Sequence, residues 1–274
     1  MISVCILGGN GTIGRALRSF LIQDPEICVS TLAISDYLLG RHHFDVVYYC
    51  IGVTSDFQTF PFRTMEAHVE LLSRVLETNR FNTLVYLSST RVYKNSMHTQ
   101  EESFLTINPH EIDSIYNISK LAGESLCMLT QNDRIRIVRL SNVVGGTPNE
   151  NSFLGFLRKS LQQGSFQLNS SLKSERDFVD IEQILFCLKE IGLKSTHKVY
   201  NVASGFNLRT EEIIEAVFKS FSFSYKVQSN ENVLHTFPII DISRISGEFN
   251  IRHYEKEDII RIILSSMNGF DHAN

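Results

Sequence analysis

The sequence predicts an α/β protein built on a doubly wound parallel sheet. Short apolar runs rich in β-branched residues alternate with segments of helical periodicity over the first half of the chain. Such alternation is typical of parallel strands that helices cover on both faces. After Gly146 the sequence becomes polar and rich in turn residues, which indicates a second, smaller α/β lobe.

The expected elements follow one another along the chain. Strands are predicted at 2–7, 27–34, 44–52, 82–90, 135–146 and 198–203. Helices are predicted at 13–21, 65–78, 115–130, 153–163, 180–191, 209–221 and 257–267. We therefore expect a first domain of residues 1–145, to which 178–203 return, and a smaller lobe of 146–177 and 204–274.

Composition and charge exclude several classes of protein. The net charge is −4 and no basic block or stripe is present, which argues against a nucleic-acid partner. The chain opens directly on an apolar strand and has no apolar run of about 18 residues, so we expect no secretion signal, no membrane span and a cytoplasmic location. The five cysteines lie far apart without metal-ligand spacing, so we expect reduced thiols and no metal site.

The segment LGGNGTIG carries three glycines at intervals of three, Gly8, Gly11 and Gly14, between the first strand and the first helix. In that position the first glycine permits a tight turn and the second lets a pyrophosphate approach the backbone. The third lets the helix pack closely on the strand. The free amide groups of a helix that begins near Thr12 and Ile13 would bind the phosphates. The pattern predicts a Rossmann-type dinucleotide-binding domain.

The next segment bears on the choice of cofactor. The second strand, ICVSTLAIS, has no carboxylate until Asp36, whereas an acidic residue at its end would bind the ribose of NAD. Without that carboxylate, Arg15 or Arg18 could pair with a 2′-phosphate, so the sequence favours NADP, with NAD as the alternative. The segment before the third strand is short. A helix and a strand of the usual unit are therefore missing or compressed, and we expect an open adenine pocket.

The segment YNISK places Tyr116 and Lys120 four residues apart, on one face of a helix. A lysine beside a phenol lowers the pKa of that phenol, so the tyrosine can act as a general acid or base. The preceding strand ends in LSSTRVY, and its hydroxyl groups would lie at the carboxyl edge of the sheet, where ligands of such folds bind.

In chain order, these segments resemble the extended short-chain dehydrogenases/reductases, the NAD-dependent epimerase/dehydratase group that modifies nucleotide sugars. The glycine pattern, DVVYYCIG, SSTRVY, YNISKLAGE, RLSNVVGG, RDFVDIEQI, VYNVASG and DISRI are similar to successive motifs of that family and cover nearly the whole chain. The resemblance implies a Rossmann-type sheet followed by a smaller substrate-binding lobe.

The resemblance also implies roles for individual residues. Tyr116 is the expected acid/base, and Ser89 would hydrogen-bond the same sugar oxygen. Lys120 would hold the nicotinamide ribose and tune Tyr116. Asn142 and Arg176 are expected at the diphosphate of a nucleotide sugar.

The sequence departs from the family at several positions. Dehydratases carry a carboxylate pair directly after the catalytic hydroxyl, but here these positions are Thr90 and Arg91, so elimination of water lacks its acid and base. Thr90 is still expected to contact the substrate. The Cys and His pair of 3,5-epimerases is not visible. In many members a helical Asn holds a relay water. His68 stands at the corresponding position here, and we expect it to have a structural role. Where a second phosphate-binding arginine is usual, His235 could substitute.

These departures leave a 4-keto-sugar reductase that uses NADPH as the expected activity. The alternative is a nucleotide-sugar 4-epimerase with tightly bound NAD. A third hypothesis, from another class, is a non-catalytic dinucleotide-binding regulator that has kept the fold. Family members often dimerise through the helices expected at 65–78 and 115–130, which predicts a homodimer.

Overall fold

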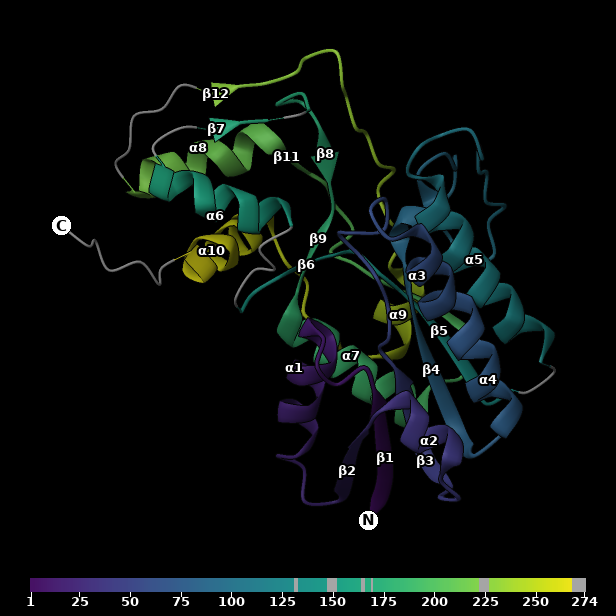
Figure 1. Cartoon of the computed structure of the whole chain (residues 1–274). Coiled ribbons are helices and arrows are strands. Elements are labelled where there is room, and N and C mark those ends of the chain that lie inside the picture. The colour runs from purple at the N-terminus through teal and green to yellow at the C-terminus, as the bar shows by residue number, and fades with distance from the viewer. Residues whose placement is uncertain (131–132, 147–151, 164–165, 169, 222–226, 268–274) are drawn as a thin grey trace.

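The centre of the protein is a six-stranded parallel sheet with the strand order β10-β5-β4-β3-β1-β2 (Figure 1). The computed structural model describes residues 1–130, 133–146, 152–163, 166–168, 170–221 and 227–267. The strands are β1 (Ile2–Leu7), β2 (Ile27–Leu32), β3 (Phe44–Tyr49), β4 (Phe81–Ser89), β5 (Ile135–Leu140) and β10 (Val199–Val202). Leu7 at the end of β1 lies opposite both Leu32 and Tyr49. The doubly wound parallel sheet expected from the sequence is confirmed.

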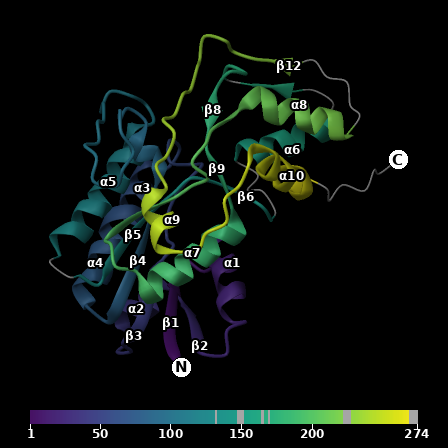
Figure 2. The same cartoon turned by 180° about the vertical axis from the view of Figure 1, so that it is seen from behind.

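Helices cover both faces of this sheet (Figures 1 and 2). One face carries α1 (Thr12–Leu21) and α7 (Ile181–Lys194), and the other carries α2 (Ile34–Leu39), α4 (Leu71–Thr78) and α5 (Ser114–Leu129). Because side chains alternate along a strand, Val4 and Ile6 pack against the first layer, and Cys5 and Leu7 pack against the second. The inner strands are therefore buried on two sides, which explains their nearly continuous apolar sequences, whereas the edge strand β2 has exposed residues.

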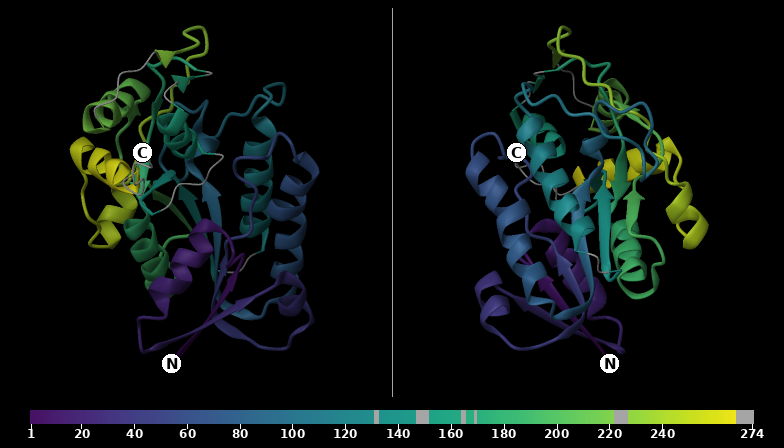
Figure 3. Two further views of the ribbon diagram at one scale, coloured as in Figure 1. Left: turned by 60° about the vertical axis from the view of Figure 1, so that its left-hand side comes forward. Right: turned by 90° about the vertical axis from the view of Figure 1, so that its right-hand side faces the viewer.

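Beyond the carboxyl ends of the strands, the second half of the chain forms an apolar cluster of its own (Figure 3). Its elements are β6 (Asn142–Val144), α6 (Phe153–Gln163), β7 (Phe166–Gln167), β8 (Glu175–Arg176), β9 (Phe178–Asp180), β11 (Leu208–Arg209), α8 (Thr210–Phe221), β12 (Val227–Gln228) and α10 (Lys256–Met267). Helix α9 (Ser243–Glu248) packs instead on β10, with Ile245 in the core of the sheet. The division into a domain of 1–145 with 178–203 and a lobe of 146–177 with 204–274 stays a prediction.

Two expected elements have a different form. The strand expected at 135–146 is broken at Ser141, where the chain leaves the sheet and continues as β6, which pairs with β9. The helix expected from Met65 begins four residues earlier, as α3 (Pro61–Met65), and continues through the π-helical turn η1 (Glu66–Glu70) into α4. A π turn changes the direction of the side chains within a helix, and such turns are frequent at functional sites.

Among the described residues, β2 is the edge strand on its side of the sheet. Between β2 and β3 the chain forms only the six-residue helix α2, which packs on the sheet through Tyr37. This arrangement agrees with the expected compression of that unit. In the described part of the chain, no helix combines the length and apolar character needed to cross a membrane.

Candidate active site

The turn after β1 uses its three glycines for three purposes. Gly8 has a φ of +86°, and a Cβ on it would lie 2.8 Å from the backbone of Cys50, just after β3. A Cβ on Gly14 would collide with the carbonyl oxygen of Gly8, so α1 packs on this turn only with glycine there. A Cβ on Gly11 would meet nothing closer than that oxygen, at 3.4 Å. The fold therefore requires the first and third glycines, whereas the second leaves room beside the turn.

Helix α1 begins at Thr12 with its first amide groups available to an anion. Gly11 is the N-cap, no side chain caps the helix, and the first turn has no acidic residue. The amide of Arg15 donates to the carbonyl oxygen of Gly11 at 3.0 Å, so Thr12 and Ile13 carry the orphan donors of the helix N-terminus. Such a terminus binds phosphate groups, and these residues fit a dinucleotide.

The end of β2 has no carboxylate where a ribose would bind. Asp36 lies in α2, is exposed, and contacts the neighbouring Ser35 hydroxyl at 3.4 Å. Arg15 and Arg18 are exposed on α1. This arrangement keeps both arginines accessible to an anion near the turn.

Ser89, Tyr116 and Lys120 come together where β4 ends beside α5. Tyr116 is 5% exposed. Burial raises the pKa of the Tyr116 phenol, while the charge of Arg91 and a hydrogen bond with Ser89 act in the opposite direction. The Lys120 ammonium donates to the carbonyl oxygen of Leu87 on β4 at 2.9 Å. Burial lowers the pKa of Lys120 to about 7. Arg91 and Ser89 thus oppose the rise that burial causes in the pKa of the Tyr116 phenol, and the role of Lys120 in tuning Tyr116 stays a prediction.

His68 is fully buried in the π turn and holds two segments together. Its Nε2 accepts a hydrogen bond from the amide of Val53 at 3.2 Å, so Nδ1 carries the proton and donates to Ser119 Oγ at 2.8 Å. Ser119 in turn donates to the carbonyl oxygen of Tyr116 at 2.8 Å. Burial lowers the pKa of His68 to about 2, so the ring is neutral. These contacts support the structural role expected for His68.

A cavity of about 320 Å³ lies beside Phe57 and Arg91, which contact the Tyr116 ring. Three residues expected to contact substrate line it, namely Thr90, Asn142 and Arg176, as does His235. The guanidinium of Arg176 lies 5.5 Å from the Phe153 ring. Burial and the charge of Arg91 lower the pKa of Arg176. Ser89, Tyr116 and Lys120 are not lining residues.

The cavity also contains two carboxyl groups, and each has protein partners. Asp177 accepts hydrogen bonds from the amides of Ser204 at 3.1 Å and Gly205 at 2.9 Å, and burial raises its pKa to about 6. Asp113 accepts from Arg91 at 3.3 Å and from Lys94 at 3.1 Å. In the described part of the chain, no cluster of three His, Cys, Asp or Glu side chains could hold a metal ion.

Sequence reasoning missed the group of side chains that contacts the Tyr116 ring. The guanidinium of Arg91 lies 4.8 Å from the centre of that ring and 5.1 Å from that of Phe57. The Phe57 and Tyr116 rings are 5.3 Å apart. Phe57 and Arg91 both line the cavity. In the sequence, Arg91 was notable only because dehydratases of this family have a carboxylate at its position, and no sequence pattern indicated a role for Phe57.

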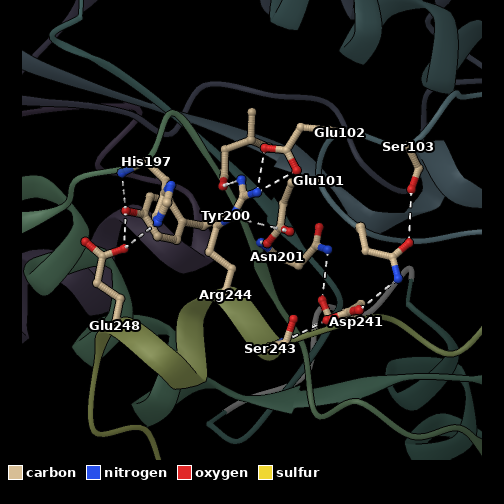
Figure 4. Close-up of polar contacts among 12 residues, drawn as sticks. Glu101, Glu102, Ser103, His197, Tyr200, Asn201, Asp241, Ser243, Arg244 and Glu248 are labelled. Atoms are coloured by element: carbon tan, nitrogen blue, oxygen red, sulfur yellow. Dashed lines mark hydrogen bonds and ion pairs between the residues drawn. The ribbon is translucent and has the colours of Figure 1, made fainter.

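The loop that carries Asp113 is anchored at its far side by a polar network (Figure 4). This loop follows the short helix η2 (Thr90–Tyr93) and runs to α5. Glu101 accepts from the backbone amide of Asn201 at 3.1 Å, and Arg244 of α9 contacts both Glu101 and Glu102. The Asn201 side chain donates to the carbonyl oxygen of Asp241 at 2.9 Å. These contacts fix the loop to β10 and α9.

Fold and site together define a dinucleotide-binding α/β protein with a Ser-Tyr-Lys set at the carboxyl edge of its sheet. The sequence profile of the NAD dependent epimerase/dehydratase family matches residues 4–203. The chain belongs to this family, as its motifs indicate. No curated protein matches the sequence significantly.

Solved structures resemble the whole chain at low sequence identity. TunA, an NAD-dependent NDP-hexosamine 5,6-dehydratase, has a TM-score of 0.83 and 19% identity, with 99% of both chains covered. UDP-glucuronic acid 4-epimerase from Bacillus cereus, solved with UDP-glucuronic acid and NAD, has a TM-score of 0.80 and 17% identity, covering 97% of this chain and 99% of its own. RMD from Pseudomonas aeruginosa, solved with NADPH, has a TM-score of 0.78 and 20% identity, covering 97% and 99%. These similarities confirm the fold.

Proposed function

We propose that the protein is an NAD(P)-dependent oxidoreductase that reduces a 4-keto group on a nucleotide-activated sugar. The observation that carries the proposal is the hydrogen bond between Ser89 and Tyr116, with Lys120 bonded to the same strand, beside a cavity lined by the half-buried cation Arg176. A dinucleotide site, an acid/base and a cationic cavity then adjoin one another at one edge of the sheet. The solved relatives include proteins with NADPH, and with NAD and a nucleotide sugar.

In this proposal each side chain has one task. The bound cofactor supplies the hydride. The Tyr116 phenol donates its proton to the carbonyl oxygen as that oxygen gains charge, because it is a hydrogen-bond donor with a raised pKa. Ser89 donates a hydrogen bond to the same oxygen and keeps it close to Tyr116. Lys120 binds the nicotinamide ribose from the adjacent turn of α5.

The activated end of the substrate would bind at the other side of the cavity. A diphosphate there would be attracted to the positive charge of Arg176. The guanidinium also suits phosphate oxygens through its paired donors. The Asn142 amide donates to the carbonyl oxygen of Asp177 at 2.8 Å, which fixes this residue at the cavity wall. His235 lies in the same wall. Thr90 borders the sugar.

Two features favour a reductase among the family's activities. Both carboxyl groups of the cavity are held by protein donors, so no described lining carboxylate is free to remove a proton during elimination. The ribose end lacks a carboxylate and presents Arg15 and Arg18, which suits the 2′-phosphate of NADP. An exchangeable NADPH is the cofactor of a reductase, whereas an epimerase retains its NAD through turnover.

The test is native mass spectrometry of the protein as purified, with any ligand released by denaturation. We expect an empty protein that takes up NADPH in preference to NADH and then reduces a 4-keto nucleotide sugar. Tyr116→Phe should keep NADPH binding and lose at least 100-fold in turnover. NAD retained at near-unit occupancy would identify the 4-epimerase instead. Binding of neither cofactor would refute both enzymes.

A further inference from the structure

We infer that His235 binds the diphosphate of the substrate beside Arg176 and takes up a proton when it does so. The affinity for a nucleotide sugar then falls as the pH rises through the neutral range. This inference rests on the proposed function, because it concerns the activated end of the proposed substrate.

The backbone of His235 is fixed against the strand that carries Arg176. The amide of His235 donates to Ser174 Oγ at 3.2 Å, and its carbonyl oxygen accepts from the amide of Glu175 at 2.9 Å. Glu175 and Arg176 form β8, so these bonds hold residue 235 beside that strand. His235 and Arg176 both line the cavity of about 320 Å³. One ligand in the cavity can therefore contact both residues.

A diphosphate brings more negative charge than Arg176 balances. In a nucleotide sugar the diphosphate is esterified at both ends and carries two negative charges, whereas a guanidinium carries one positive charge. A protonated His235 supplies the second positive charge and donates from both ring nitrogens, while a neutral imidazole donates from one. Hydrogen bonds from a charged donor to phosphate are also the stronger ones. The protonated ring therefore suits the complex.

Before substrate binds, the surroundings of His235 favour the neutral ring. Burial lowers the pKa of His235, and the charge of Arg176 lowers it further. Lys94 and Arg91 act in the same direction, and Asp113, which contacts both of these cations, opposes them. Two negative charges beside the ring would raise this pKa, as adjacent opposite charges do. Binding then draws a proton from the solvent onto His235, and no covalent bond of the substrate changes.

Two carboxyl groups near His235 could also respond to a bound diphosphate. Asp177 lines the same cavity, and burial raises its pKa to about 6, so a nearby anion could protonate it as well. Glu175 lies beside His235 on β8, but its carboxylate pairs with Arg209 at 3.1 Å. A measurement of proton uptake must therefore be made with and without the imidazole of His235.

The test measures binding and proton uptake without turnover. UDP-glucose, dTDP-glucose and GDP-mannose carry a 4-hydroxyl group, so NADPH cannot reduce them, and their diphosphates do not titrate near neutral pH. Isothermal titration calorimetry with NADPH present, from about pH 6 to about pH 8.5 and in buffers of different ionisation enthalpy, gives the affinity and the protons taken up. We compare the parent with His235→Gln and His235→Arg. His253→Gln is the control, because His253 is exposed and does not line the cavity.

The parent should take up a proton and bind the tightest of the three ligands about tenfold more weakly at the highest pH than at the lowest, the effect of a pKa change of about one unit. His235→Gln should lose the proton uptake and bind weakly at every pH. His235→Arg should bind with an affinity that does not depend on pH, and His253→Gln should match the parent. Proton uptake that persists in His235→Gln would assign it to another group and overturn the inference.

NMR spectroscopy follows the ring directly. The Hε1 resonance of His235, identified by its absence from the spectra of His235→Gln and His235→Arg, should titrate with a higher midpoint in the nucleotide-sugar complex than in the free protein. An equal or lower midpoint would overturn the inference and leave the proposed function intact, because the nucleotide sugar would still bind. Failure of all three nucleotide sugars to bind at any pH would refute the proposed function, and this inference with it.

Discussion

The glycine turn and the ion pair buried behind α5 both support the parallel sheet, but the sequence specifies them in different ways. The turn is built within one short segment, from the backbone of Gly8, Gly11 and Gly14. The charges come from separate elements: Glu124 of α5 pairs with Arg139 of β5 at 2.6 Å, and both side chains are 5% exposed. Local geometry specifies the first region, whereas only the folded chain assembles the second.

The difference lies in what each region costs. A glycine turn needs a positive φ at Gly8 and the absence of a side chain at Gly14, and it leaves Gly11 open to a ligand. A buried ion pair must make up for the lost hydration of two charges, and it does so only with further hydrogen bonds. Glu124 also accepts from Ser88, and Arg139 also donates to Tyr93 and to the carbonyl oxygen of Glu101. Helix α5 is thus joined to the loop that carries Asp113.

Breaking the buried pair should have the largest effect. Arg139→Met leaves Glu124 as an uncompensated buried charge, so we expect a loss of about 3–5 kcal/mol in the free energy of unfolding, measured by urea denaturation. Arg136→Met on the same strand is the matched control, because Arg136 bonds Ser195 and backbone carbonyls and pairs with no buried carboxylate among the described residues. Its loss should be about 1 kcal/mol. Equal losses in the two variants would show that the pair adds nothing beyond packing.

Substitutions in the glycine turn should separate effects on stability from effects on cofactor binding. A methyl on Gly14 meets backbone that cannot move aside, so Gly14→Ala should cost roughly 1–3 kcal/mol of stability. Gly11 has an ordinary φ of −73° and open space, so Gly11→Ala should change stability by less than about 1 kcal/mol.

The two variants should differ again in NADPH binding, followed by the fluorescence of the nicotinamide. Gly11→Ala should weaken binding at least tenfold, because its methyl lies where the pyrophosphate approaches the turn. A Gly11→Ala protein with unchanged affinity would place the phosphates elsewhere. The contrast with Arg139→Met remains: the turn can lose its ligand and keep its fold.

This contrast explains what the sequence could predict. The sheet, its helices and the positions of Ser89, Tyr116 and Lys120 follow from periodicity and short motifs, because neighbouring residues determine them. Arg91 and Asp113 are in contact although they are 22 positions apart in the sequence, and Phe57 contacts Tyr116 from another part of the chain. No spacing rule relates such residues. The motif identifies Lys120, but its expected effect on the pKa of Tyr116 depends on the position of its ammonium, which the motif does not specify.

Lys120 offers the finest test of this buried environment, through the pH dependence of stability. Its pKa is about 7 in the folded protein and about 10.4 in an unfolded chain, so between these values the unfolded state binds the extra proton. Stability due to Lys120 therefore rises with pH across this window and is lost as pH falls toward 7. Lys120→Met removes the dependence. The difference in unfolding free energy between parent and variant should move in favour of the parent by about 2 kcal/mol from pH 7.5 to 9.5, at up to about 1.4 kcal/mol per pH unit.

Urea denaturation at several pH values measures this difference, and Lys173→Met is the control because Lys173 is exposed. Its difference from the parent should stay constant with pH. A constant difference for Lys120→Met as well would mean that the ammonium is hydrated and charged beside Tyr116.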